Sequence, residues 1–201
     1  MTETSAGVAR GDRRRTALLE SLDHHLRESS LDSINIADIS RRAGVTRSAF
    51  YFYFENKASA VAALMEEMYD ESLLAADQLR ADGSPAENID AMVRGLFSAW
   101  DKHEHLFRAS LDARATSATV RELWDDDRES FVPVIASMIE AERAAGAAPA
   151  GTDATALASV LLELNDRMLE RLALGGALER EQLVEAVVSV WLHTIYGEVR
   201  R

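Results

Sequence analysis

The sequence predicts an all-α protein with about nine helices, built as an N-terminal three-helix head and a larger C-terminal helical body. Three observations predict this fold class. The chain of 201 residues has only 10 glycines and 3 prolines, which is low for a loop-rich β protein. Alanine, leucine, glutamate and arginine dominate, and all four favour helices. Apolar residues recur at helical spacing, and no segment shows the strict alternation of a strand.

The predicted helices begin and end at residues that favour helix termini. Asn35 and Thr46 suit the N-cap position, and Gly44 suits the C′ position. Pro85 suits a first helical turn, whereas Pro133 lies inside a predicted helix and should kink it. On these grounds the predicted helices cover residues 13–29, 36–43, 47–53, 57–80, 85–101, 104–113, 117–145, 153–173 and 179–196.

The chain divides into three predicted parts with different charge. Residues 1–12 are small and polar and should form a disordered arm. Residues 13–56 form the head, and residues 57–201 form the body, with helix 57–80 linking the two. The whole chain carries a net charge of −12, but residues 1–57 hold nine basic and eight acidic side chains. An acidic body repels DNA, so any contact with nucleic acid must use the head.

Several classes of protein are excluded. The chain has no cysteine, which rules out disulfides, thiol catalysis, iron–sulfur clusters and cysteine-ligated zinc. No Ser-His-Asp spacing, P-loop or dinucleotide-binding glycine pattern is present, so we expect neither an enzyme nor a cofactor. His103 and His105 are two residues apart and would point in different directions on a helix, which disfavours a metal site. No apolar run could span a membrane and no signal-peptide core is present, so we expect a cytoplasmic protein.

Residues 36–53 have the layout of a helix-turn-helix, in which the second helix enters the major groove of DNA. At 100° per residue, one side of the second helix carries Arg47, Ser48, Tyr51 and Phe52. Arginine can read guanine, and Thr46, Ser48 and Tyr51 can hold phosphates, with Lys57 and Arg13–Arg15 adding charge. Two alternatives remain at this point. Similar helix pairs occur in proteins that never touch DNA, and the aromatic run 50–54 could form a buried strand.

The sequence around this layout resembles a known signature. The segment reads INIADISRRAGVTRSAFYFYFENKASAVAALM and is similar to the N-terminal motif of TetR-family transcriptional regulators, over about residues 13–65. Residues 85–198 resemble the EthR-like subgroup through ARATSATVRELW, LNDR and WLHTIYGE. The resemblance implies that Thr46, Arg47 and Ser48 face the groove. It further implies phosphate contacts by four residues, which are Asn35, Tyr51, Tyr53 and Lys57.

The resemblance also implies that the body binds a small effector and dimerises through its last two helices. Five large side chains of the predicted helical body could line an apolar cavity, namely Trp100, Trp124, Phe131, Met138 and Trp191. The alternative is that they form an ordinary packed core. Asn165 lies among leucines and needs a partner if it is buried, which could be a ligand carbonyl or a backbone group.

The last two predicted helices, 153–173 and 179–196, carry a surplus of apolar residues that a two-fold helical bundle would bury. The surplus consists of Val160, Leu164, Leu183, Val187, Val190 and Ile195. The sequence therefore predicts a homodimeric, ligand-responsive regulator, expected to be a repressor. It would bind an inverted-repeat operator in double-stranded DNA and be released by a small apolar effector. The alternatives are a ligand-binding helical protein with no DNA role and a constitutive DNA-binding repressor without an effector.

Overall fold

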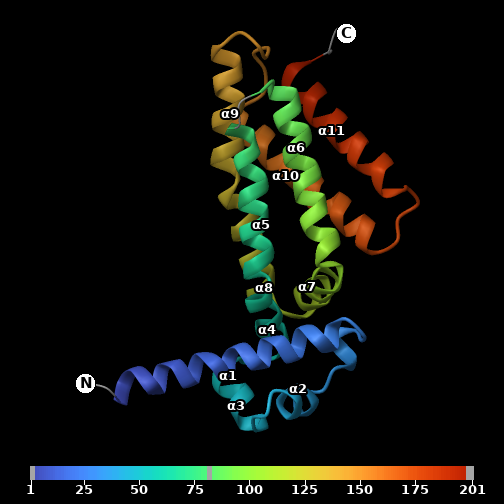
Figure 1. The fold of residues 1–201 in the computed structure, drawn as a ribbon. Helices are drawn as coiled ribbons and strands as arrows, with labels where there is room; N and C mark the ends of the chain where they lie inside the picture. Colours follow the sequence, from blue (N-terminus) through green and yellow to red (C-terminus); the bar gives the residue numbers. More distant parts are fainter. Residues whose placement is uncertain (1–2, 81–82, 198–201) are drawn as a thin grey trace. The chain divides into compact units, whose positions relative to one another are not determined.

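The all-α fold class is confirmed. The structure, a computed structural model, describes residues 3–80 and 83–197, and within these ranges it contains eleven α-helices, two short 3-10 helices and no strand (Figure 1). Three short segments lie outside the described residues. They are residues 1–2 of the predicted arm, residues 81–82 between the predicted helices 57–80 and 85–101, and residues 198–201 of the predicted body. The described helices occupy the segments where the sequence predicts nine, because two of the predicted helices are each divided in two.

The head helices are short apart from the first. They are α1 (Glu3–Leu26), the 3-10 helix η1 (Leu31–Ser33), α2 (Ile36–Arg42), α3 (Arg47–Tyr53) and α4 (Lys57–Leu64). Helix α1 begins at Glu3, ten residues before the predicted start, and the disordered arm over residues 1–12 stays a prediction. Once a helix has formed, adding a residue fixes one more hydrogen bond, and this segment contains no proline to stop it.

The remaining helices follow the predicted segments with two breaks. They are α5 (Glu66–Asp77), η2 (Gln78–Arg80), α6 (Pro85–Lys102), α7 (Glu104–Thr116), α8 (Ala118–Ser130), α9 (Val132–Ala144), α10 (Ala154–Ala173) and α11 (Arg180–Tyr196). The kink predicted at Pro133 is a complete break at Phe131, which places the proline in the first turn of α9. A second break at Met65 divides the predicted helix 57–80, and no proline or glycine in the sequence marks it.

The described chain forms two compact units. The head unit runs through Glu67 and also contains Glu104–Leu123. The body unit contains Met68–His103 and the chain from Trp124 onwards. The structure thus groups α7 with the head helices, whereas the sequence divides the chain once, after residue 56. Helix α7 joins the head because its apolar face packs on α4 and α1.

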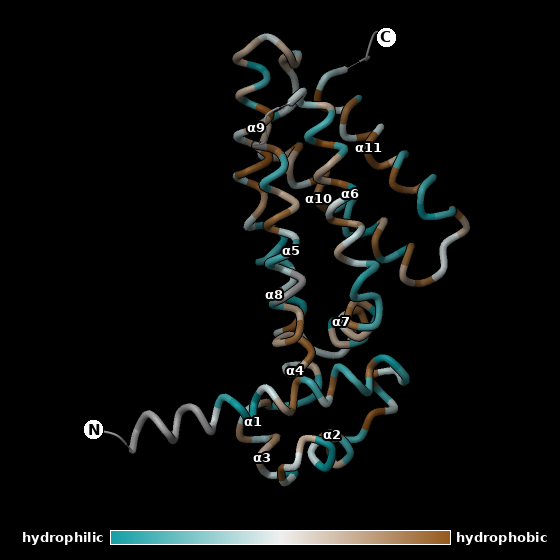
Figure 2. The backbone as a smooth tube through the Cα atoms, in the orientation of Figure 1, coloured by the Kyte–Doolittle hydropathy of each residue, from teal (hydrophilic) through white to brown (hydrophobic). Residues whose placement is uncertain are grey.

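Each unit has its own apolar core. In the head unit α1 packs on α2 and α4, and in the body unit α10 packs on α9 while α11 packs on α6 and α10. Figure 2 shows polar and apolar residues alternating along the helices, as expected of helices that each cover one side of a core. No helix within the described residues is long and apolar enough to cross a membrane.

Candidate functional site

The turn between α2 and α3 is a Schellman motif that fixes the direction of α3. Gly44 has φ of +67°, a conformation that strains any residue with a Cβ atom. The Gly44 N–H donates to the Arg41 carbonyl at 3.2 Å, and the Val45 N–H donates to the Ser40 carbonyl at 3.0 Å. These two bonds satisfy carbonyls at the end of α2. The predicted C′ position of Gly44 is therefore confirmed.

Both helices of this pair start at the predicted N-caps. The Asn35 side chain accepts a hydrogen bond from the backbone N–H two residues on, at 2.9 Å. The Thr46 hydroxyl accepts from the N–H three residues on, at 3.3 Å. Both side chains are exposed. Each oxygen is thus used by its own helix, and in Asn35 the amide N–H groups are what remain to meet a phosphate.

Helix α3 presents the predicted two faces. Phe50 and Phe54 are buried in the head core, with ring centroids 5.5 Å apart. Arg47, Ser48 and Tyr51 are exposed, as the helical spacing predicts. Residues 50–53 of the aromatic run are therefore helical rather than a buried strand, and Phe54 is the C-cap that follows.

Two of the outward residues act as a pair. The Arg47 guanidinium donates a hydrogen bond to the Tyr51 hydroxyl at 3.3 Å. Its central carbon also lies 5.7 Å from the centre of the Tyr51 ring, within the range of a cation–π contact. Residues four apart on a helix meet in this way. The pairing restricts the direction of the Arg47 guanidinium in the protein without bound DNA.

Tyr53 lies between the two faces. Its side chain is half-buried, and its hydroxyl lies 3.7 Å from where a Cβ atom on Gly11 of α1 would be. The position follows the helical spacing, which turns this residue toward the head core. Its predicted phosphate contact stays a prediction, with the hydroxyl set beside the N-terminal half of α1.

Lys57 is held by contacts that the sequence does not predict. Its predicted place beside the DNA backbone stays a prediction, and in this structure its ammonium donates to three backbone carbonyls, those of Leu31, Asp32 and Ile34. An ammonium has three N–H donors, so these bonds use its whole capacity. Lys57 therefore ties the start of α4 to the connection between α1 and α2. Spacing along the sequence gives no sign of this contact, because the partners lie 23–26 residues away.

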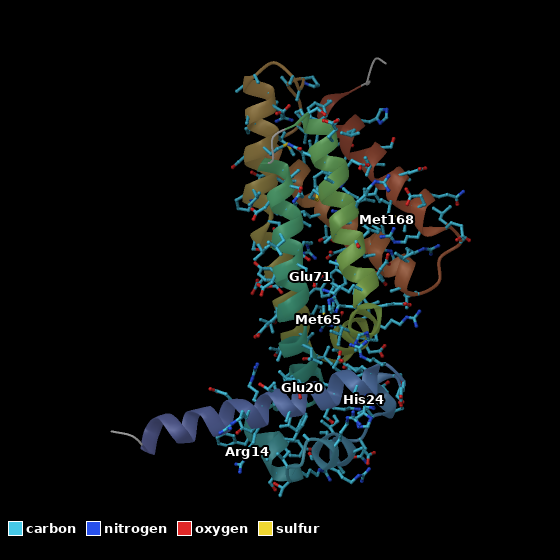
Figure 3. The ribbon with its side chains drawn as sticks, viewed as in Figure 1. Arg14, Glu20, His24, Met65, Glu71 and Met168 are labelled. Carbon is cyan, nitrogen blue, oxygen red and sulfur yellow. The ribbon has the colours of Figure 1, made fainter. Side chains whose placement is uncertain are left out.

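The arginines of α1 divide between packing and exposure. The Arg15 guanidinium lies over the Phe54 ring, 5.6 Å from its centre, and so covers the head core. Arg14 is exposed on the same stretch of α1 (Figure 3). Arg14 is therefore better placed than Arg15 to add positive charge to the surface of α1.

In the body unit the structure brings together two of the six predicted ligand-binding residues around one hydrogen bond. Asn165 on α10 is 2% exposed, and its Oδ1 accepts from the indole N–H of Trp191 on α11 at 3.0 Å. The indole can only donate, so this bond fixes which end of the amide faces it. The Asn165 amide nitrogen is buried and has no hydrogen-bond partner among the described residues.

The other predicted residues are distributed over the body. Trp100 and Trp124 form a ring pair with centroids 5.3 Å apart. Trp124 also donates to Asp166 at 2.7 Å, so it contacts α10 at the residue next to Asn165. Phe131 instead pairs with the Tyr69 ring at 5.7 Å.

Met138 is half-buried on α9, which packs on α10. That all six line one cavity stays a prediction.

A cluster of charge beside Asp166 is one feature that the sequence patterns did not predict. The Arg128 guanidinium on α8 lies 3.1 Å from Glu163 and 3.4 Å from Asp166, both on α10, and 2.9 Å from Asp125. Burial lowers the pKa of Arg128. The surrounding carboxylates raise it by more than burial lowers it, so the pKa of Arg128 lies above its ordinary value. The acidic run in α8 is visible in the sequence, but its partners on α10 are not.

The two histidines near the start of α7 contact different carboxylates. His103 lies 3.3 Å from Glu71 in the body unit, and His105 lies 2.7 Å from Asp23 in the head unit. Their side chains point to different partners, as the two-residue spacing predicts. No group of three potential metal ligands occurs within the part of the chain that the structure describes.

The predicted dimer surface is smaller than the sequence suggests. Leu183, Val187 and Ile195 are buried within the body unit, so they are core residues and cannot form an interface. Val160 on α10 and Val190 on α11 are 65% and 44% exposed. The correction arises because α11 turns part of its apolar face toward α6 and α10.

Comparison with known proteins agrees with this organisation. Residues 26–64 match the model of bacterial regulatory proteins of the tetR family, and residues 89–197 match that of the transcriptional regulator EthR, C-terminal domain. The chain is 30% identical over 195 residues to the HTH-type transcriptional regulator EthR of Mycobacterium tuberculosis, covering 94% of this chain and 90% of that protein.

Solved structures share the fold. NalD, the secondary repressor of the MexAB-OprM multidrug efflux pump in Pseudomonas aeruginosa, has a TM-score of 0.70 at 16% identity, covering 96% of this chain and 98% of that one. SmeT, solved in a complex with triclosan, has a TM-score of 0.64 at 18% identity, covering 88% and 90%. With a helix-turn-helix capped as its sequence predicts and a body of the EthR type, the chain belongs to the TetR family of bacterial transcriptional regulators and is not an enzyme.

Proposed function

We propose that this regulator is a ligand-responsive repressor that binds an inverted repeat as a dimer and is released by a small apolar effector. TetR-family regulators bind DNA as dimers and often bind small-molecule effectors. The observation that carries the ligand response is the buried Asn165 amide, which has two N–H donors and no partner for them among the described residues.

The chemistry of that amide restricts the effector. An unsatisfied buried polar group costs about 1–3 kcal/mol, so a ligand that satisfies it gains affinity. Because Trp191 holds the oxygen, the nitrogen is the end that faces a ligand, and the ligand must offer an acceptor. Asn165 lies on the buried side of α10 together with apolar residues of the same helix, Leu161, Leu162 and Leu169. A mainly apolar molecule with one carbonyl fits these requirements, and the triclosan complex of SmeT is an example of a small apolar ligand on this fold.

The effector must favour the form of the protein that leaves DNA. A dimer presents two α3 helices to successive major grooves about 34 Å apart. A ligand that binds the off-DNA form more tightly by about 1.4 kcal/mol lowers operator occupancy tenfold.

The experiment uses paired compounds that differ only at the carbonyl, such as an aryl ketone and the corresponding hydrocarbon. The ketone should quench tryptophan fluorescence and release DNA in the same concentration range, and the hydrocarbon should bind more weakly. Asn165→Leu should weaken the ketone by about 1–2 kcal/mol and leave the hydrocarbon unchanged. Trp191→Phe keeps the amide donors but releases the amide oxygen, so it should also weaken the ketone if Trp191 orients the amide.

Two results decide against parts of this proposal. If Asn165→Leu weakens both compounds equally, the amide has only a structural role. If no compound changes DNA occupancy while the protein represses a reporter placed behind its operator, the protein is a constitutive repressor.

The dimer is proposed to use the exposed apolar residues of α10 and α11. Val190→Asp should give a monomer in sedimentation velocity, because burying an unpaired charge costs several kcal/mol. Leu74→Asp, at another exposed apolar position on α5, is the control and should leave the dimer intact. If the double variant Val160→Asp and Val190→Asp is still a dimer, the interface lies elsewhere. Deleting residues 1–56 is not a clean test, since α4 and α7 belong to the head unit.

A further inference from the structure

Phe52 has an unusual position for a phenylalanine. Its side chain is 81% exposed, more than any other large apolar side chain that the structure describes. Full burial of such a ring stabilises a protein by about 1.5–3 kcal/mol, and the head core does not use it. Phe52 lies on the outward side of α3, the helix that this family inserts into DNA. The exposed Phe52 ring is therefore available to a partner outside the chain.

The neighbours of Phe52 on α3 form two parallel rows along the helix. Arg47 and Tyr51 form one row and share a hydrogen bond, so their polar groups are already directed. Ser48 and Phe52, also four residues apart, form the second row. The Phe52 ring meets the Tyr53 ring edge-on, with centroids 4.9 Å apart, a contact that leaves most of it uncovered. The outward side thus has a polar row and a row that ends in an apolar ring.

The chemistry of the ring limits what it can recognise. Phenylalanine neither donates nor accepts a hydrogen bond, so it cannot read the polar edges of guanine, cytosine or adenine. In the major groove the thymine 5-methyl is the apolar group that distinguishes one base from the others. We propose that Phe52 is a specificity-determining residue that packs on a thymine methyl in each half-site. The proposal rests on the DNA binding of the family and is independent of the ligand response.

The dimensions of α3 are compatible with this contact. Seven residues make a helix about 10 Å long, which fits along a major groove about 12 Å wide. Ser48 and Phe52 are about one helical turn apart, or about 5.4 Å, compared with about 3.4 Å between base pairs. The thymine read by Phe52 should therefore lie one or two base pairs from the position closest to Ser48.

The test removes the methyl group and nothing else. The full chain is used to select an inverted-repeat duplex from a randomised library, and each thymine is then replaced by deoxyuridine. At one thymine per half-site, wild-type affinity should fall about fourfold for one substitution and about fifteenfold for both, the value expected for one buried methyl each. In Phe52→Ala the same substitutions should have no effect. Phe52→Leu, which keeps an apolar side chain, should retain part of the dependence.

Controls separate this role from folding and from general affinity. Leu123→Ala removes another exposed apolar side chain of the head unit and should leave the methyl dependence unchanged. Phe52→Ala should melt at the wild-type temperature, because its ring covers little of the core.

Three results would overturn the inference. They are a methyl dependence that persists in Phe52→Ala, the absence of any methyl-dependent thymine in the wild type, and an equal loss by Phe52→Ala on all duplexes. The last result would place the ring on the sugar–phosphate backbone. Failure of the wild type to select any duplex would instead contradict DNA binding itself.

Discussion

Replacement of Lys57 by methionine should destabilise the head unit without changing the number of phosphates that the protein contacts. Methionine keeps the length of the side chain and removes the ammonium. The Lys57 ammonium donates to three carbonyls. Those of Leu31 and Ile34 are partly buried, and that of Asp32 is exposed to water. The variant leaves the Ile34 carbonyl without its donor and leaves the Leu31 carbonyl with the Ile34 backbone N–H at 3.4 Å.

The magnitude follows from these contacts. A hydrogen bond to a charged group contributes about 1.5–3 kcal/mol, and water can replace the ammonium at the exposed carbonyl. Two partly buried bonds that are not fully additive give an expected loss of about 2–4 kcal/mol. Since about 1.4 kcal/mol is a factor of ten, the population of the opened head unit should rise at least about 30-fold.

Two measurements separate this role from a phosphate contact. Hydrogen exchange followed by mass spectrometry should show faster exchange in α2 and α4 of Lys57→Met. The slope of log affinity against log salt should equal that of the wild type, whereas loss of one phosphate contact would reduce it by about 0.9. Lys102→Met is the control, because Lys102, the other lysine of the chain, forms an exposed pair with Glu71 and contributes little. Unchanged exchange together with a shallower salt slope would refute the reasoning.

Three further predictions concern the head unit. Burial raises the pKa of Asp23, but hydrogen bonds from His105 and Arg27 lower it more, so its pKa lies below its ordinary value. Its contribution to stability is therefore complete above about pH 4 and lost as the pH falls through the lower folded-state value. Asp23→Asn should cost about 1 kcal/mol at about pH 7 in urea unfolding and little at about pH 2; an equal cost at both would contradict a charge effect. Gly44→Ala should cost about 1–2 kcal/mol through φ alone, since no atom lies within 4 Å of the new Cβ, and an unchanged melting temperature would show that the turn relaxes. Tyr51→Phe should weaken operator binding severalfold by releasing the Arg47 guanidinium, an effect that should vanish in an Arg47→Ala background if the two act as one unit.

The local features of this protein could be predicted from the pattern of side chains alone. The caps at Asn35 and Thr46, the turn at Gly44 and the burial of Phe50 all depend on residues within one or two turns of each other. Hydrogen bonds of caps and turns span two to five residues, so the order of residue types is sufficient to place them. The same holds for the outward side of α3, whose exposed residues follow from about 100° per residue.

Contacts between distant segments could not be predicted in this way, because they arise only when the chain folds. Lys57 ties two segments together since folding brings three carbonyls from the connection before α2 to the start of α4. Leu183 and Val187 are core residues because α11 packs on α6, and an apolar helix face does not reveal which neighbour will cover it. The Asn165 side chain was recognisable as a polar group among leucines, but only the position of Trp191 decides that its amide nitrogen is the end without a partner among the described residues. Burial and pairing across helices depend on how the whole chain packs, and spacing along one helix carries no record of that.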